Sequence, residues 1–270
     1  MKTNHALRNT IIIVFVALVV SFPVVKTSAQ FFLDKTKKPS EIALTDLAKI
    51  TDNRSNQIIE HLGYTLSYNT LWHVPNWVAY QLTKAETFGK VPRSDTFMPD
   101  PFVHGAVITP DDYNNSGYDR GHMAPAGDMK WSKQAMNESF YMTNVCPQNP
   151  NLNGGDWRDL EERVRLYAQW YDELFIVCGP IVSANPQTIG NNKVAVPDSF
   201  YKVLLKKNES GYDAIGFVFQ NQAGHKPISS YVVTVDSVET LSGIDFFTFL
   251  PDAIENSVEA NYSLTIWNMR

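Results

Sequence analysis

One stretch of 44 residues constrains this chain more than any other part of it. Residues 118–161 read YDRGHMAPAGDMKWSKQAMNESFYMTNVCPQNPNLNGGDWRDLE. A polar segment at 119–122, which we expect to form a turn, precedes an apolar run at 139–144 that is typical of a strand. A turn rich in Pro, Asn and Gly then leads into an expected amphipathic helix that opens at Asn153. The apolar side chains of that helix recur at spacings of four, three and four residues: Leu160, Val164, Tyr167 and Tyr171.

The reactive side chains of this stretch indicate phosphodiester chemistry. His122 has an unperturbed pKa near neutrality and can take a proton from water. Arg120 lies two residues before it, so in an extended segment both side chains share one face, and a guanidinium suits a phosphate group. Asn144, Asn153 and Glu161 supply hard oxygen atoms, and no Cys or His zinc pattern lies nearby. A metal here would therefore be Mg²⁺, Mn²⁺ or Ca²⁺ rather than zinc.

The order of the motifs is as informative as their composition. An Asp-Arg-Gly-His segment at 119–122 is followed by Asn-x-x-Pro-Gln at 144–148, and then by Asn153 and Glu161. This order resembles the DNA/RNA non-specific endonucleases, the ββα-metal or His-Me finger nucleases that include endonuclease G. The resemblance implies an α+β fold with a mixed or antiparallel central sheet and flanking helices.

The resemblance extends beyond this stretch. Arg93, in Pro-Arg-Ser-Asp-Thr-Phe, matches an upstream phosphate-binding Arg of the family. The segments at 75–80 and 243–247 also look like family segments, so the resemblance covers roughly residues 60–250. A four-residue motif alone is weak, but an ordered set of motifs is specific.

The resemblance implies a role for each residue of the predicted site. His122 would be the general base, and Asn153 would hold a single Mg²⁺ (or Mn²⁺) ion that otherwise keeps its waters. Arg120 and Arg93 would neutralise the phosphate oxygens. Glu161 would orient metal-bound water from outside the ligand shell.

Each role has a plainer alternative. His122 could be structural, Asn153 could cap the helix, and Glu161 could be an ordinary solvated acid. Asn144 could orient His122 or its neighbours, or it could simply end a strand. Asp119 could brace the turn by hydrogen bonds or ligate a metal.

The function implied is cleavage of DNA and RNA without preference for sugar or sequence. All the named groups address the phosphate backbone, which carries no sequence information. Two other classes remain open: an inactive nucleic-acid-binding protein on the same fold, and a hydrolase of another phosphodiester or a nuclease effector toxin. DNA and RNA are the expected partners, and a homodimer and a protein inhibitor remain open as further partners.

The first 29 residues stand apart from the rest. Lys2 and Arg8 precede an unbroken apolar run at 11–20, and small residues end at Ala29. This pattern predicts a secretory signal peptide at 1–29 and a secreted or periplasmic protein without stable membrane association. The alternative is an uncleaved N-terminal anchor.

Cleavage after Ala29 would leave 20 Lys and Arg against 28 Asp and Glu, a formal charge of −8. That balance argues against a protein that coats nucleic acid, because such binding depends on many basic side chains. It does not exclude an enzyme with a local basic cleft.

The remaining pattern predicts one endonuclease domain at 59–270 after a lead-in at 30–58. A short helix is expected at 41–50, and residues 84–117 are expected to form a long loop. Strand signals occur at 63–68, 77–83, 174–182, 199–206, 212–220 and 229–235. The two cysteines, Cys146 and Cys178, could form a disulfide or remain two buried thiols.

Overall fold

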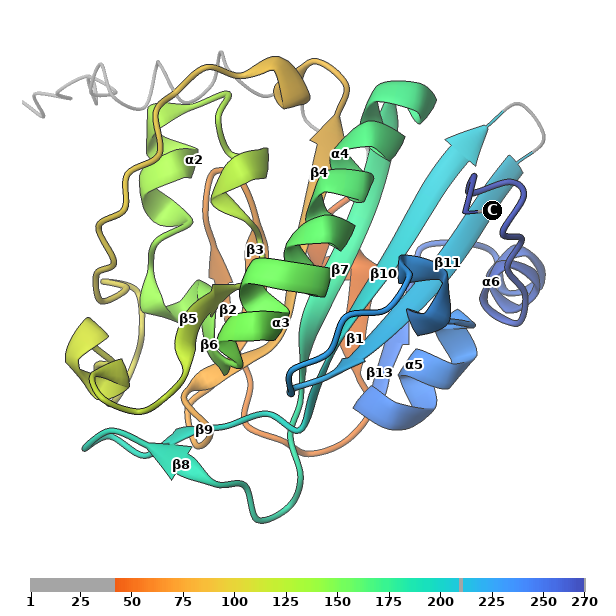
Figure 1. Ribbon diagram of the computed structural model, residues 1–270. Coiled ribbons are helices and arrows are strands. Elements are labelled where there is room, and N and C mark those ends of the chain that lie inside the picture. Colours follow the sequence, from red (N-terminus) through yellow and green to blue (C-terminus); the bar gives the residue numbers. More distant parts are fainter. Residues whose placement is uncertain (1–41, 209–210, 270) are drawn as a thin grey trace, which may run out of the picture. The chain divides into compact units, whose positions relative to one another are not determined.

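A seven-stranded antiparallel sheet forms the centre of the structure, a computed structural model that describes residues 42–208 and 211–269. The predicted signal peptide at 1–29 lies outside the described residues. The strand order is β12-β11-β10-β7-β4-β3-β2, and every neighbouring pair is antiparallel (Figure 1). The strands are β2 (Gln57–Glu60), β3 (Thr65–Asn69), β4 (Val74–Thr83), β7 (Glu173–Ile181), β10 (Ser199–Asn208), β11 (Gly211–Gln220) and β12 (Val232–Val233). The expected antiparallel sheet is thus confirmed.

The sheet is buried on both faces because its central strands alternate between two hydrophobic layers. On β7, Ile176 and Cys178 belong to one layer, and Phe175 and Val177 belong to the other. One layer is covered by α2 (Lys133–Glu138), α3 (Pro150–Leu152), α4 (Arg158–Tyr171) and the pair β5 (Asp119–His122) and β6 (Val145–Gln148). The other is covered by α5 (Val235–Ser242), α6 (Asp252–Glu259) and the pair β1 (Ala48–Ile50) and β13 (Ile244–Phe246).

Short elements complete the described part of the chain. The pair β8 (Thr188–Ile189) and β9 (Val194–Ala195) stands apart from the main sheet, and a π-helical turn, Asn153–Trp157, joins α3 to α4. The 3-10 helices are Leu44–Leu47, Glu86–Phe88, Pro110–Tyr113, Ala126–Asp128, Met142–Asn144 and Ile228–Tyr231. Among the described helices, none has the length and apolar character needed to cross a membrane.

Three sequence expectations about local structure are wrong. The segment at 119–122 is strand β5 rather than a turn, because it pairs with β6. The strand expected at 139–144 begins only at Val145, since a 3-10 helix occupies 142–144. The described part of the helix expected at 41–50 contains a 3-10 helix and then β1, whose backbone pairs with β13.

The last expected strand, at 229–235, is also largely replaced. A 3-10 helix fills 228–231, and only Val232 and Val233 pair with β11. The Thr234 side chain accepts a hydrogen bond from the Ser237 amide at 3.2 Å and so starts α5. The other expected strands are confirmed, with bounds that differ by a few residues.

The two cysteines are free and fully buried, which decides between the alternatives left by the sequence. Cys146 lies on β6 and Cys178 on β7. The Cys178 thiol donates to the Met123 carbonyl oxygen at 3.1 Å. Both therefore act as small core side chains that hold β5–β6 against the sheet.

Candidate active site

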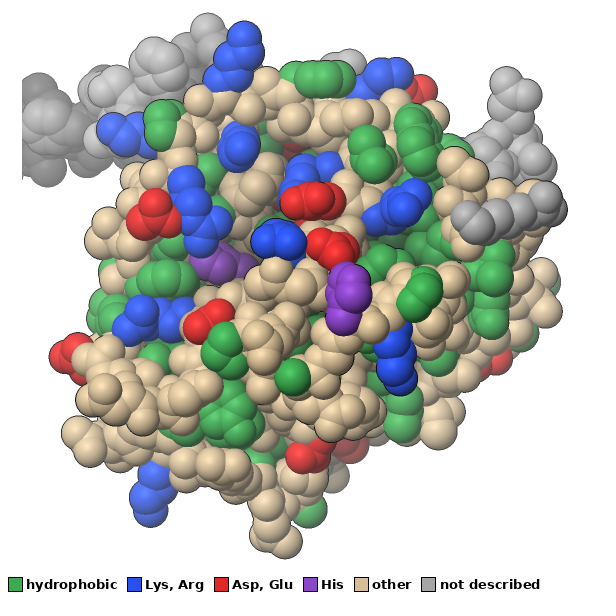
Figure 2. Space-filling view, in the orientation of Figure 1, with side chains coloured by type: hydrophobic (Ala, Val, Ile, Leu, Met, Phe, Trp, Pro, Cys, Tyr) green, Lys and Arg blue, Asp and Glu red, His purple; other side chains and the backbone are tan. Residues whose placement is uncertain are grey.

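The predicted site lies where the β5–β6 pair meets the start of α4. Gly121 faces Cys146 across this pair, and a Cβ atom at Gly121 would lie 2.2 Å from the Gln148 Oε1 atom, so the close approach requires glycine. The Trp157 indole Nε1 donates to the His122 carbonyl oxygen at 3.3 Å. These contacts join β5 and β6 to the π-helical turn that precedes α4. Figure 2 shows acidic, basic and histidine side chains gathered near the middle of this face of the molecule.

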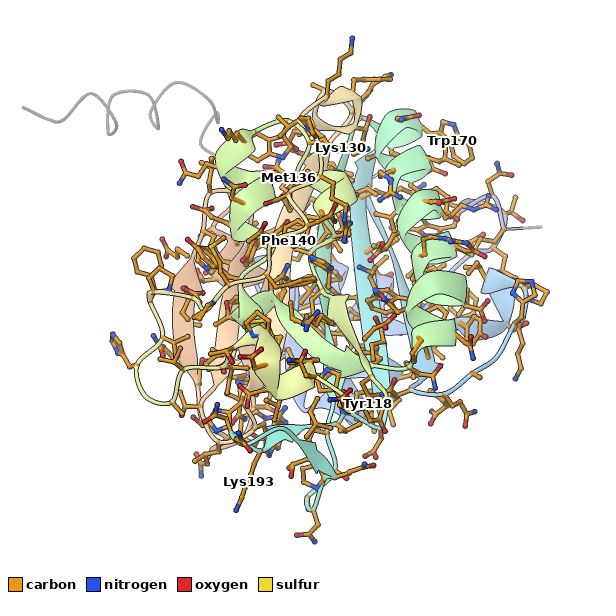
Figure 3. The ribbon with its side chains drawn as sticks, turned by 60° about the vertical axis from the view of Figure 1, so that its left-hand side comes forward. Tyr118, Lys130, Met136, Phe140, Trp170 and Lys193 are labelled. Carbon is orange, nitrogen blue, oxygen red and sulfur yellow. The ribbon has the colours of Figure 1, made fainter. Side chains whose placement is uncertain are left out.

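His122 is enclosed by aromatic rings. Its imidazole lies 5.2 Å from the Phe97 ring and 4.9 Å from the Phe140 ring, measured between centroids. Phe140 itself lies next to α2, on the side of the β5–β6 pair (Figure 3). His122 is 8% exposed, and its Nε2 atom has no hydrogen-bond partner among the described residues. Burial, helped by the nearby positive charge of Arg93, lowers the pKa of His122 to about 3, so the imidazole is neutral at pH 7.

Arg120 lies beside one of these rings, Phe97. Its guanidinium carbon lies 5.4 Å from the centroid of the Phe97 ring. One nitrogen, Nη2, donates to the Pro110 carbonyl oxygen at 3.0 Å and to Asn114 Oδ1 at 3.2 Å. The buried Nε atom has no partner among the described residues, so the side chain is held in place with donor capacity to spare.

Arg93 lies in a loop and contacts the other ring, Phe140. Its guanidinium carbon lies 5.0 Å from the Phe140 ring centroid, and its Nε atom is paired with Asp95. The side chain is half exposed. Phe97 and Phe140 both contact the His122 imidazole, and each of these two rings also contacts one of the arginines.

Asn144 is buried and shapes the chain that follows His122. Its Oδ1 atom accepts from the Ala124 amide at 2.9 Å, and its Nδ2 atom donates to the carbonyl oxygens of Ala124 and Ser139, each at 2.8 Å. Its own carbonyl oxygen accepts from the Met123 amide at 2.9 Å. The residue precedes β6 rather than ending a strand, and it fixes the neighbours of His122.

Asn153 opens the π-helical turn, and its side chain points to β5 instead of capping a helix. Its Nδ2 atom donates to Asp119 Oδ2 at 2.9 Å, whereas the cap of α3 is Asn149. Asp119 therefore braces Asn153 rather than its own segment. Among the described residues, no hydrogen bond is made to the Asn153 Oδ1 atom, which leaves an amide oxygen available to a cation.

The oxygen atoms at this place fit a sparsely ligated hard cation. Asn153 supplies an amide oxygen, and Asp119 supplies a carboxylate beside it. Two groups of three acidic or His side chains occur in the described part of the chain, and neither includes Asp119 or Glu161. Such a set suits Mg²⁺ or Mn²⁺, which retain several waters, better than a closed zinc site.

Glu161 lies on α4 near a cluster of three charged side chains that act on its pKa: Asp128, Arg165 and Lys202. Burial raises the pKa of its carboxyl to about 7, the positive charge of Lys202 opposes that rise, and Asp128 adds to it. The Glu161 side chain is partly exposed. Its environment is therefore neither that of a solvated helix acid nor that of a closed ion pair.

Three members of this cluster were not expected from the sequence. Asp128 is fully buried, accepts from Tyr80 at 2.9 Å and pairs with Arg165 at 2.8 Å. Lys202, on β10, is 0% exposed, and its Nζ atom has no hydrogen-bond partner among the described residues. A charged side chain buried without a full set of partners is costly, so it marks a place of interest.

A sequence signal for Lys202 existed. The residue interrupts the apolar strand Ser-Phe-Tyr-Lys-Val-Leu-Leu, and period two places it on the same face as Phe200 and Leu204. That face packs under α4, and the Lys202 Nζ atom lies 4.7 Å from the Trp157 ring centroid. A lysine at an inward position of a central strand could have been identified as a buried cation.

Comparison with known proteins places these features in a family context. The profile described as DNA/RNA non-specific endonuclease matches residues 47–253, beginning within the predicted lead-in at 30–58. The chain is 35% identical over 207 residues to the mitochondrial nuclease EXOG of Danio rerio, covering 70% of this chain and 60% of that protein. It is 34% identical to a nuclease of Nostoc sp., covering 76% of this chain and 78% of the relative.

A solved structure gives the same result. The crystal structure of EndoG in complex with EndoGI matches with a TM-score of 0.70 and 32% identity, covering 74% of this chain and 89% of that one. The predicted fold class is thereby confirmed. The chain spans only 56–60% of the length of the EXOG relatives from Danio rerio, Mus musculus, Homo sapiens and Xenopus laevis.

Proposed function

The chain belongs to the DNA/RNA non-specific endonuclease family, and from this premise we propose that it is a metal-dependent endonuclease. It hydrolyses phosphodiester bonds in DNA and RNA with little preference for sugar or sequence. The observation that carries the proposal is the neutral His122 imidazole, whose Nε2 atom has no hydrogen-bond partner among the described residues and whose two neighbouring rings each contact an arginine.

His122 is the general base in this proposal. A neutral imidazole nitrogen accepts a proton from the water that attacks phosphorus. The low pKa of His122 in the free enzyme makes it a weak base, and the negative charge of a bound phosphate raises that pKa when substrate arrives. Enclosure by Phe97 and Phe140 keeps the ring in one orientation.

Arg120 and Arg93 bind the phosphate. Arg120 is already positioned by Pro110 and Asn114, so little side-chain freedom is lost when substrate binds. Arg93 is half exposed and releases Asp95 to reach the phosphate. Their positive charges offset the negative charge that grows on the phosphate oxygens in the transition state.

Asn153 would hold a Mg²⁺ or Mn²⁺ ion through its amide oxygen, and that ion would stabilise negative charge on the leaving oxygen. Asp119 orients the Asn153 amide by accepting its N–H group. Glu161, as a carboxylate, orients water in the same region.

Export and an inhibitor are further parts of the proposal. The charged residues and apolar run within 1–29 support cleavage near Ala29 and a secreted or periplasmic location. Mass spectrometry of the protein outside the cytoplasm should find an N-terminus near Gln30, and recovery of the intact chain there would contradict cleavage. Because EndoG forms a complex with an inhibitor, a protein inhibitor of this chain is also proposed.

The test is cleavage of supercoiled plasmid and of RNA by the purified protein, with Mg²⁺ and with EDTA. His122→Ala should reduce the rate at least ~10²-fold, the lower end for loss of a general base. The matched control is His104→Ala, an exposed histidine away from the site, which should cleave at the wild-type rate. Full activity of a folded His122→Ala variant would contradict the proposal, and substrate binding without cleavage by the wild type would favour the inactive binding protein.

A further inference from the structure

A second group of carboxylates lies on the opposite face of the sheet from His122. Asp236 and Glu239 come from α5, and Glu259 is the last residue of α6. One carboxylate oxygen of each lies within 4.8 Å of one carboxylate oxygen of the other two. These residues belong to no part of the proposed nuclease mechanism.

The group is unusual because it is partly buried without a compensating charge. Glu259 is only 5% exposed, and its Oε1 atom has no hydrogen-bond partner among the described residues. Two more acids, Asp245 and Glu255, act on the same site. No ion pair to any of these five carboxylates occurs within residues 42–208 and 211–269.

The electrostatic consequence is strong mutual repulsion. Glu239 Oε1 accepts a hydrogen bond from the Phe246 amide at 2.9 Å, whereas the buried Glu259 Oε1 atom has no such partner among the described residues. Lys49 lies across from Asp245 in the β1–β13 pair, at the edge of the group, and is exposed. A buried acid of this kind needs either a proton or a cation to be stable.

The Ser242 hydroxyl is a second buried oxygen atom without a hydrogen-bond partner among the described residues. Ser242 follows Glu239 by three residues on α5, so these two side chains are neighbours on the helix surface. Ser242 is 5% exposed, and its Oγ atom, like Glu259 Oε1, is buried without a partner. Two unsatisfied oxygen atoms therefore occur on the two helices that meet here.

We propose that Asp236, Glu239 and Glu259 form a binding site for Ca²⁺ that fastens α6 to α5. Ca²⁺ takes six to eight oxygen ligands at about 2.3–2.6 Å, so ligands on opposite sides of the ion are about 4.6–5.2 Å apart. Three carboxylate oxygens within 4.8 Å of one another fit one such sphere, and water completes it. Ca²⁺ accepts this irregular geometry more readily than Mg²⁺ does.

The site has a structural role. Val258, next to Glu259, packs against the hydrophobic layer that α5 also covers. A cation shared by α5 and α6 removes the repulsion between their acids and holds α6 on the sheet. The ion would thus raise the stability of the folded protein by binding the folded state alone.

Thermal unfolding of the chelated protein tests the site. Ca²⁺ at about 100 times its Kd should raise the Tm of the wild type by about 5 °C or more. Glu259→Gln should lose this shift, and without Ca²⁺ its Tm should equal or exceed that of the wild type, because a repelled acid is gone. Glu60→Gln, an exposed acid on β2, is the matched control and should keep the full shift.

Two further measurements separate this site from the candidate active site. Asn153→Ala should keep the Ca²⁺ shift, because the proposed catalytic metal would be lost but the α5–α6 site retained. If Glu259→Gln does not fold, Asp236→Asn replaces it, since Asp236 is exposed and its loss should weaken Ca²⁺ binding measured by calorimetry at least tenfold. A wild-type Tm that Ca²⁺ leaves unchanged would overturn the site and indicate that the acids share protons instead. A shift lost in Asn153→Ala and kept in Glu259→Gln would also overturn it, because the bound Ca²⁺ would then lie at the candidate active site.

Discussion

The chemistry of single residues in this protein is decided by their immediate surroundings. His122 and Glu161 are both shifted away from their ordinary pKa values, and burial is the largest cause for each. The pKa of His122 is lowered and the pKa of Glu161 is raised, and each shift favours the neutral form of its side chain. The positive charge of Lys202 opposes the rise in the pKa of Glu161, so a lysine outside the proposed mechanism influences a candidate site residue.

Replacing Lys202 should therefore change the pH dependence of the rate. Glu161 acts as a carboxylate, so kcat/KM should fall as the pH decreases through its pKa of about 7. Lys202→Met removes the charge that lowers this pKa, and the acidic limb of the profile should move to higher pH. A movement of one pH unit lowers the rate about tenfold on the acidic side.

The measurement is kcat/KM between pH 5 and 9 for the wild type and for Lys202→Met. The control is Lys193→Met, because Figure 3 places Lys193 on an exposed loop far from the labelled Phe140. An unchanged profile in a folded Lys202→Met variant would show that Lys202 has only a structural role.

At the scale of elements, the site depends on how β5 is attached to the helix that follows β6. The Asn153 amide and the Asp119 carboxylate make that attachment on one side, and the Trp157 indole makes it at the His122 carbonyl. Asn144 fixes the chain between β5 and α2 through its bonds to Ala124. The elements are short, so these side-chain bonds set their positions.

Loss of the Asp119 carboxylate should weaken metal binding without removing a residue that touches the phosphate. In Asp119→Ala the Asn153 amide can turn, so the Mg²⁺ concentration for half-maximal activity should rise about 10–100-fold, with a smaller change at saturating Mg²⁺. The control is Asp198→Ala, an exposed acid elsewhere. Wild-type Mg²⁺ dependence in Asp119→Ala would contradict this role for the carboxylate.

At the scale of the whole molecule, the net charge limits how substrate is held. A chain cleaved after Ala29 carries a formal charge of −8, so long-range attraction to nucleic acid is weak and a few local contacts must suffice. In the proposed mechanism, Arg93, Arg120 and the metal all contact phosphate, and none of them reads a base edge.

Cleavage should accordingly be insensitive to sequence and sensitive to salt. Arg120→Ala should slow cleavage of several duplexes, a single strand and an RNA by similar factors, because a lost phosphate contact is lost on every substrate. Added salt should inhibit all of them. Parallel digestions at two salt concentrations measure this, and a variant that changed which sequence is cut would contradict it.

The burial of both cysteines in the core predicts how their thiols react. Cys146 and Cys178 are both 0% exposed, and burial raises the pKa of each thiol. Neither should react with a thiol reagent in the folded protein, and two thiols should react after unfolding in denaturant. A denatured, unreduced sample with no reactive thiol would instead demonstrate a disulfide.

Local patterns in the sequence determined the family, most of the strands of the sheet and helix α4. The strands at 174–182, 199–206 and 212–220 were predictable because their residues are consistently apolar over a whole strand length. The candidate site residues could be predicted because the ordered motifs resemble those of the family. The structure brings His122, Arg120 and Arg93 together around two shared rings.

Tertiary structure decided what depends on residues far apart in the chain. Segment 119–122 becomes a strand only because β6 pairs with it, and the strand near Asn144 starts late because that side chain bonds to Ala124, 20 residues earlier. The low pKa of His122 depends on burial, to which the distant Phe97 ring contributes. The pKa of Glu161 responds to Lys202, which the sheet places beneath α4. Burial and charge coupling act through space, so short-range sequence patterns cannot specify them.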